Sequence, residues 1–313
     1  MIEYDPHSWR EHFFDIKGSV VRQIFWRVLF FFAWSVAVYV FHRFVYPVHV
    51  PSTVHTLIGV ALGLLLVFRT NASYERFWEG RRMWGGIVNE TRNLSRAATA
   101  FLRDQPALLE ETILWTITFP FAAMHALRGT RGLGPIAERL PKEQVAATLA
   151  AQHVPSAVAL RISNLLARAR KSGQASDYMV ISIDNNVQLL IDYLGACERI
   201  QKTPLPFAYV VHLRRALILY CLTLPFALIG TYGWYTILDM LLIAYILFGI
   251  EEIGVEIENP FGEDDNDLPL EAICETIERN LLAVIAEGRA PASLNKSVGA
   301  FSALSLSVLS LGL

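Results

Sequence analysis

Apolar positions gather in four stretches that form two close pairs, at about 24–40 and 54–68 and at about 216–229 and 232–248. A helix needs roughly 20 apolar residues to cross a hydrocarbon core of about 30 Å, and each stretch reaches or approaches that length. The polar segment between the two pairs is far too long for a membrane loop. The pattern therefore predicts a membrane protein with a large water-facing helical body.

Four transmembrane helices are expected, at about 24–44, 54–68, 210–229 and 232–249, with a cytosolic body at about 69–205 and 250–290. Residues 1–290 are interpreted as one domain. Residues 291–313 are rich in Ser, Ala and Leu and are interpreted as a poorly ordered tail. No segment has the pattern of a β-strand, so the predicted fold class is all-α.

The helix that begins near Val54 is expected to continue beyond the membrane as one long rod until about Trp84. Residues 113–124 are apolar but short, and Pro120 interrupts them. We therefore expect a buried core helix there rather than a fifth span. Further helices are predicted at about 91–127, 142–152, 156–171, 178–202 and 268–287.

Charge and composition narrow the function classes. Charged residues make up 18% of the chain, against about 25% in soluble domains. The net charge of -2 gives no basic field for nucleic acid. The three cysteines lie far apart and form no CxxC pair, so neither a disulfide framework nor a zinc ribbon is supported.

Basic residues set the expected orientation in the membrane. Lys and Arg cluster before the first and third stretches and after the second, whereas the short connections within each pair hold almost none. The positive-inside rule then places both termini and the helical body in the cytoplasm. We expect a multi-pass protein of the inner membrane that contacts lipid.

The second apolar stretch carries Val60, Leu64 and Phe68 at i, i+4 and i+8, which places them on one helix face. Gly59 and Gly63 form a small-xxx-small pair on the adjacent face, where a copy of the helix could approach closely. In a ring of such helices the apolar ridge would be a hydrophobic constriction that gates by dewetting. Ordinary lipid-facing or bundle-facing positions are the alternative, and spacing alone does not separate the two.

Four motifs carry a more specific signal. They are FRTNASYERFW at 68–78, GACERI at 195–200, TPLPFAY at 203–209 and NPFGEDDNDL at 259–268. In this order and spacing they resemble the bestrophin family, and its bacterial branch in particular, over essentially the whole chain except the tail. The resemblance implies a homopentameric ion channel, shaped as a barrel around an axial pore.

The resemblance also implies roles for individual residues. The narrow neck of the pore would be formed by Val60, Leu64 and Phe68, and a second constriction at the cytosolic exit by Leu205, which stands between two prolines. A residue that only connects two helices is the alternative for Leu205. Arg69 and Asn71 follow the neck directly and are predicted to line the wider cytosolic vestibule. Their charge and polarity would there bias the sign of the permeant ion.

The acidic run at 263–267 admits two interpretations. Clustered carboxylates beside an Asn suit a hard, oxygen-seeking cation. By resemblance to the calcium clasp of animal bestrophins, Asn259, Asp264 and Asp267 would be the ligands of a divalent cation, Ca²⁺ or Zn²⁺. The other interpretation is a solvated acidic turn before the helix that begins near Leu270, where negative charge favours the helix N-terminus. No cofactor is required by the rest of the chain.

Several functions remain open at this point. An enzyme is not expected, since the chain carries no HExxH or GxSxG motif. A transporter would show matched internal repeats, and the two apolar pairs do not resemble each other. A membrane scaffold would conduct nothing. The motifs favour a passive channel for small monovalent ions, with chloride or another anion implied by the family and a monovalent cation, Na⁺ or K⁺, as the alternative.

Overall fold

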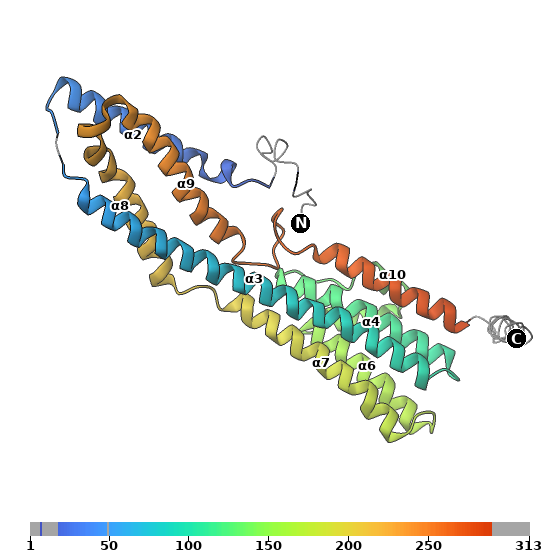
Figure 1. Ribbon diagram of the computed structural model, residues 1–313. Helices are drawn as coiled ribbons and strands as arrows, with labels where there is room; N and C mark the ends of the chain where they lie inside the picture. Colours follow the sequence, from blue (N-terminus) through green and yellow to red (C-terminus); the bar gives the residue numbers. More distant parts are fainter. Residues whose placement is uncertain (1–6, 8–17, 49, 290–313) are drawn as a thin grey trace, which may run out of the picture. The chain divides into compact units, whose positions relative to one another are not determined.

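The computed structural model describes residues 7, 18–48 and 50–289, and within these residues every regular element is a helix (Figure 1). The all-α prediction is therefore confirmed for the described part of the chain. The expected tail at 291–313 lies outside it. The elements are α2 (Val21–Phe44), α3 (Thr53–Phe101), α4 (Pro106–Leu127), η1 (Pro135–Arg139), α5 (Lys142–Leu149), α6 (Val154–Lys171), α7 (Asp177–Lys202), α8 (Phe207–Tyr232), η2 (Gly233–Tyr235), α9 (Thr236–Glu256) and α10 (Leu270–Arg289).

The chain divides into two compact units. Unit 1 comprises residues 1–83 and 196–269, and unit 2 comprises residues 84–195 and 270–313. Unit 1 holds α2, α8, α9 and the first part of α3, which are the apolar elements of the sequence pattern. Unit 2 holds α4, α5, α6, α10 and the remainder of α3.

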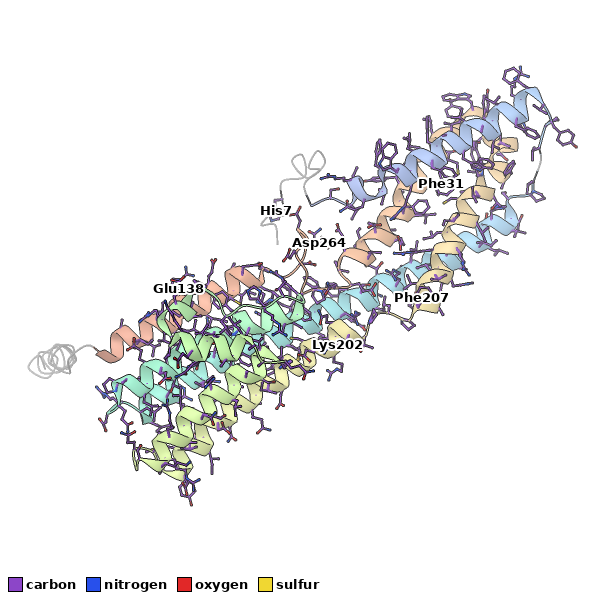
Figure 2. All side chains as sticks on the ribbon, turned by 180° about the vertical axis from the view of Figure 1, so that it is seen from behind. His7, Phe31, Glu138, Lys202, Phe207 and Asp264 are labelled. Atoms are coloured by element: carbon purple, nitrogen blue, oxygen red, sulfur yellow. The ribbon has the colours of Figure 1, made fainter. Side chains whose placement is uncertain are left out.

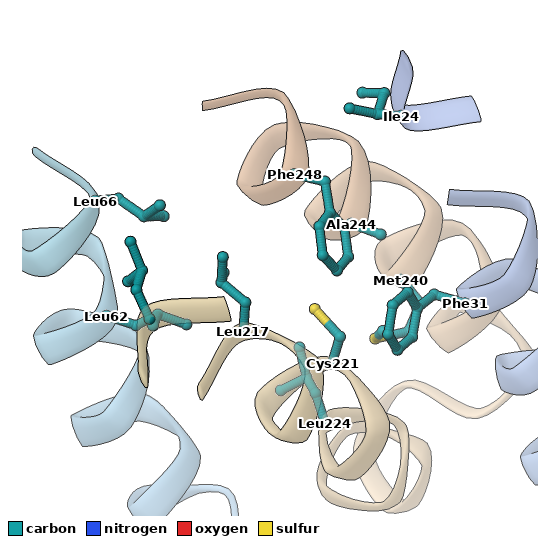
Figure 3. Packing of buried hydrophobic residues seen from close by; sticks show 11 residues of the cluster. Ile24, Phe31, Leu62, Leu66, Leu217, Cys221, Leu224, Met240, Ala244 and Phe248 are labelled. Atoms are coloured by element: carbon teal, nitrogen blue, oxygen red, sulfur yellow. The ribbon is translucent and has the colours of Figure 1, made fainter. Parts of the chain in front are cut away.

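The core of unit 1 is a layer of apolar side chains from α2, α3, α8 and α9 (Figure 3). Phe31 of α2 stacks on Phe248 of α9 with ring centroids 5.3 Å apart. Leu62 and Leu66 of α3 are 2% exposed and belong to the same cluster as Leu217 of α8. These helices are apolar around most of their circumference, which is the composition expected of helices that meet lipid or partner subunits on their outer side.

Ion pairs join three of these helices at the end of the apolar layer. Arg27 of α2 contacts Glu252 of α9 at 2.5 Å, and Arg214 of α8 contacts Glu251 at 2.8 Å. Glu251 is buried, so its charge depends on these partners. Arg27 lies at the start of the first apolar stretch, Arg214 precedes the third, and the two glutamates follow the fourth. The positive-inside rule places the cytoplasmic boundary at these stretch ends.

By length and composition, three helices in the described part of the chain could cross a membrane, namely α2, α3 and α4. In the most apolar window of α4, 78% of the residues are buried, against 22% in α2 and 17% in α3. This burial agrees with the prediction that α4 is a core helix. The expected spans at α8 and α9 are not among the three, so the count of four transmembrane helices stays a prediction.

Unit 2 packs around α4. Trp115 and Phe119 of α4 are fully buried, and α4 contacts both α6 and α10. The hydroxyls of Thr112 and Thr116 donate to the carbonyls of the residues four positions earlier, which satisfies these polar groups inside the core. Pro120 does not end the helix, which continues to Leu127.

The long rod is longer than predicted. We expected α3 to end near Trp84, before Gly85 and Gly86, but it continues to Phe101. Gly86 has a packing role instead: a Cβ placed there would lie 2.5 Å from the ring of Tyr193 on α7. The glycine therefore permits a close approach of two helices, and the helix runs through it.

All three cysteines are free thiols and are buried. Burial raises the pKa of Cys197 and of Cys274 to about 12, so these two thiols stay protonated at neutral pH.

A pair of glycine substitutions tests the packing of α3 against α7. Gly86→Ala should lower stability by about 1–3 kcal/mol, because the new methyl group overlaps the ring of Tyr193. Gly195→Ala on α7 meets no atom within 4 Å and should be neutral or raise stability by up to about 1 kcal/mol. Thermal unfolding in detergent measures both. Equal effects of the two substitutions would contradict the close approach at Gly86.

Candidate ion pathway

The exposed ridge of α3 consists of the residues predicted for the neck. Val60, Leu64 and Phe68 are 62%, 56% and 63% exposed, whereas Leu62 and Leu66 on the opposite face are buried in the core of unit 1. The helix therefore has one face packed within its own chain and one apolar face left open. Large apolar side chains exposed in a row are typical of a surface that meets a partner or a membrane.

The pair Gly59 and Gly63 on α3 differs from the prediction. A Cβ at Gly59 would lie 2.8 Å from the hydroxyl oxygen of Tyr220, so α8 of the same chain occupies the face that we assigned to a copy of α3. At Gly63 a Cβ would meet nothing within 4 Å. The small-xxx-small pair is thus explained at one of its two positions by packing within unit 1.

Leu205 lies in the short connection between α7 and α8, which Lys202 and Phe207 bracket in Figure 2. Its side chain is half-buried. Pro204 and Pro206 fix their own φ angles and hold the residues before them in extended conformations. The backbone N–H of Leu205 donates a hydrogen bond of 3.1 Å to Oε1 of Glu258, which anchors this turn from a distant part of the chain.

Arg76 secures the same turn through backbone carbonyls. Its Nη2 donates to the carbonyl oxygen of Ile200 at 2.6 Å, its Nη1 donates to that of Thr203, and its Nε donates to that of Glu258 at 3.2 Å. The last carbonyls of α7 have no partner within the helix and carry the negative end of its dipole. A guanidinium at that position satisfies both needs and ties the end of α7 to the segment after α9.

Glu258 is the residue that joins these parts. Its Oε2 pairs with Nη2 of Arg69 at 3.2 Å, and its Oε1 accepts the hydrogen bond from Leu205. Arg69 follows Phe68 directly on α3. One carboxylate therefore connects the helix that carries the candidate neck to the turn that carries the candidate aperture.

The prediction that Arg69 lines a vestibule is corrected by its burial. Its side chain is 1% exposed, and its guanidinium passes beside Gly254 of α9, where a Cβ would lie 3.4 Å from Nε. Consecutive helical residues point about 100° apart, so Arg69 turns into the protein while Phe68 points outward. Asn71 is exposed, and its place in a vestibule stays a prediction.

The sequence alone did not single out Glu258 or Arg76 as functional residues. Arg76 lies within the motif at 68–78, and Glu258 directly precedes the motif at 259–268. The only available signal was this adjacency. Arg76 lies more than 120 residues from its partners, and Glu258 lies 53 residues from Leu205 and 189 residues from Arg69. No local pattern encodes such pairings.

The acidic segment forms a closed turn. Oδ2 of the buried Asp267 accepts a hydrogen bond of 2.8 Å from the backbone N–H of Asp264, and the N–H of Asp267 donates to the carbonyl of Asp264 at 3.0 Å. A Cβ at Gly262 would lie 2.5 Å from Oδ2 of Asp267 and 3.3 Å from Nδ2 of Asn259. The side chains of Asp267 and Asn259 thus lie over Gly262, whereas Asp264, which is labelled in Figure 2, is exposed.

The acidic turn is held by contacts with other parts of unit 1. Within the described residues, no group of three or more His, Cys, Asp or Glu side chains is placed to hold a metal ion. Asn266 of the same segment bonds to the carboxylate of Glu256 at 2.9 Å and to the carbonyl of Gly18 at 3.0 Å, which fixes the turn to other parts of unit 1. Burial raises the pKa of Glu256. Metal binding by Asn259, Asp264 and Asp267 stays a prediction, and so does the alternative of an acidic turn that favours the N-terminus of α10.

Substitution of Glu258 tests the ion pair with Arg69. Glu258→Gln keeps an acceptor for Leu205 but leaves the buried guanidinium without its counter-charge, so stability should fall by about 3 kcal/mol. Adding Arg69→Met removes the buried charge and should recover part of the loss. Asp265→Asn, an exposed carboxylate of the same segment, is the control and should stay within about 0.5 kcal/mol. Thermal unfolding in detergent that shows no recovery in the double variant would refute the pair.

Comparisons with known proteins agree with these motifs. The family described as bacterial/fungal bestrophin proteins matches residues 1–283. A voltage-dependent anion channel-forming protein of Nostoc sp. is 40% identical over 87% of this chain and 90% of its own length. The voltage-dependent anion channel-forming protein YneE of Escherichia coli strain K12 is 33% identical over 94% of this chain and 97% of its own length.

The fold is shared with a solved structure of the same family. The crystal structure of a bacterial bestrophin homologue from Klebsiella pneumoniae superimposes with a TM-score of 0.79 at 33% sequence identity, covering 84% of this chain and 98% of the other. Sequence and structure lead to the same assignment over most of the chain. The protein belongs to the bestrophin family, in its bacterial and fungal branch.

Proposed function

We propose that this protein is an anion channel of the inner membrane, built as a homopentamer around an axial pore with both termini in the cytoplasm. The observation that carries the proposal is the open apolar face of α3, where Val60, Leu64 and Phe68 are all more than half exposed while the opposite face is packed. The relatives named as anion channel-forming proteins support the ion sign. Burying these side chains around an axis would remove apolar surface from water in every subunit.

The neck formed in this way would select by dehydration. Rings of aliphatic and aromatic side chains offer no hydrogen bonds to an ion or to its water shell, so passage requires partial loss of hydration and the constriction gates by dewetting. Large, weakly hydrated anions lose water most easily. We therefore expect permeability to rise from chloride to iodide.

The second constriction would be held rigid by the contacts of Leu205. Its backbone N–H is fixed by Glu258, and the turn before it is fixed by Arg76. In this proposal Leu205 meets its copies at the cytosolic exit. Selectivity there depends on a turn whose position is set by charged groups behind it and not by the apolar side chain alone.

A monovalent-cation channel is the second candidate, and two observations favour it. Burial of Arg69 removes a positive charge from the surface that follows the neck. Continuing the ridge at i+11 and i+15 from Val60 leads to Asn71 and Glu75, both exposed. A carboxylate on the pore-facing stripe would attract cations and repel anions.

The reversal potential of the purified channel in a planar bilayer under a KCl gradient decides between the two. Reversal near the chloride equilibrium potential supports the anion channel. Reversal near the potassium potential assigns the protein to cations, and Glu75→Gln should then reduce the cation preference. Absence of any conductance from a folded oligomer contradicts both forms of the proposal.

Substitutions on opposite faces of α3 test the neck. Leu64→Ala should widen the constriction and raise halide flux into liposomes with little effect on stability, because its side chain is exposed within the chain. Leu66→Ala, two residues later on the buried face, should cost about 2–5 kcal/mol of stability and leave the flux per folded channel unchanged. If the two variants raise flux equally, the ridge is not the neck.

A further inference from the structure

Three arginines of unit 2, on α3 and just after it, are not used by the proposed pore. Arg92, Arg96 and Thr99 follow one another at i, i+4 and i+7, which places them on one face of α3, and Arg103 lies in the turn that follows the end of the helix at Phe101. All three arginines are exposed. Like charges four residues apart on a helix repel, so Arg92 and Arg96 destabilise α3 unless negative charge comes near.

The three arginines form one wall of a cavity of about 590 Å³, which is also lined by Ser95, Thr99, Asn280, Leu281 and Val284. The other walls come from α4 and α10, which belong to the same unit. No carboxylate is among the lining residues. Small-molecule sites usually measure about 300–1,000 Å³ and combine apolar walls with a few convergent polar groups, and this cavity has both properties.

The arginines have no counter-charge in the described part of the chain. Other arginines of unit 2 are paired: Arg128 with Glu271, Arg139 with Glu110 and Arg168 with Glu111. Within residues 18–48 and 50–289, Arg92, Arg96 and Arg103 take part in no ion pair and no hydrogen bond. Three positive groups thus converge on a cavity that brings no negative group to meet them.

Ser95 supplies a second, independent observation. It lines the cavity, its side chain is 1% exposed, and its Oγ has no hydrogen-bond partner among the described residues. Thr99, by contrast, donates its hydroxyl to the carbonyl of Ser95 at 2.8 Å and is satisfied within the helix. A buried hydroxyl without a partner is unfavourable, and a ligand oxygen in the cavity would satisfy it.

We propose that this cavity binds a small organic anion with at least two negative charges on phosphate or carboxylate groups. Guanidinium groups bind both groups bidentately, and Ser95 and Asn280 can donate further hydrogen bonds. Leu281 and Val284 contact the apolar part of the ligand. The site lies within one unit of one chain, so it does not depend on the proposed pore.

Calorimetry and thermal unfolding on the full-length protein in detergent test the site. The probes are sodium pyrophosphate and sodium citrate, each compared with NaCl at equal ionic strength. At least one probe should raise the melting temperature beyond the NaCl control, since a ligand that binds only the folded state stabilises it. A shift of the melting temperature with pyrophosphate alone identifies phosphate as the recognised group, and a shift with citrate alone identifies carboxylate.

Variants locate the binding. Arg96→Gln should weaken binding about tenfold or more, because it removes a charge-assisted contact. Arg279→Gln on α10, an exposed arginine outside the cavity, is the matched control and should bind as the unchanged protein does. Ser95→Ala should weaken binding while leaving the stability of the ligand-free protein equal or higher, since it removes an unsatisfied buried hydroxyl.

These outcomes separate the site from non-specific attraction. A shift no larger than that of NaCl with both probes overturns the proposal, as does equal weakening by Arg96→Gln and Arg279→Gln. If Arg96→Gln does not fold and shows no melting transition without ligand, Ser95→Ala tests the site in its place. A purely structural role of Ser95 would not give weaker binding together with equal or higher stability.

Discussion

The buried ion pair between Arg69 and Glu258 is the interaction on which the organisation of unit 1 depends. A guanidinium that is 1% exposed can remain inside the protein only with a counter-charge, because the desolvation of an unpaired ion costs several kcal/mol. This requirement fixes the segment after α9 against α3. The same carboxylate then holds the backbone of Leu205, so the turn between α7 and α8 takes its position from an ion pair on another helix.

Charge at this point also explains how one helix serves two environments. Before Arg69, both the exposed and the buried face of α3 are apolar. At Arg69 the buried face changes from leucines to a charged group. Before it, Leu62 and Leu66 pack in the apolar core; after it, Arg76 binds backbone carbonyls. The exposed face changes in the same place, from Phe68 to the polar Asn71 and Glu75.

Local pattern predicted a large share of this architecture. Helix type, the apolar stretches and the core position of α4 follow from hydrophobicity and from breaks at Pro and Gly. The role of Val60, Leu64 and Phe68 was predicted from the family motifs, because a helix that is apolar all round shows no contrast between its faces.

The position of Arg69 was predicted wrongly, since its neighbour in sequence, Phe68, points outward. The long helix was expected to end near Trp84, because nothing local shows that Tyr193 packs against Gly86. Glu258 was missed because its partners are distant in sequence.

The contacts of Arg76 have a consequence for how this protein can vary. The guanidinium binds carbonyl oxygens of Ile200, Thr203 and Glu258, and every amino acid supplies that atom. Side chains at positions 200 and 203 can therefore change without loss of these hydrogen bonds to Arg76. Position 76 itself cannot, since the planar fork of an arginine reaches several acceptors in fixed directions and a lysine presents one point of charge. In this contact the residues that supply the carbonyl oxygens tolerate substitution, and the arginine that binds them does not.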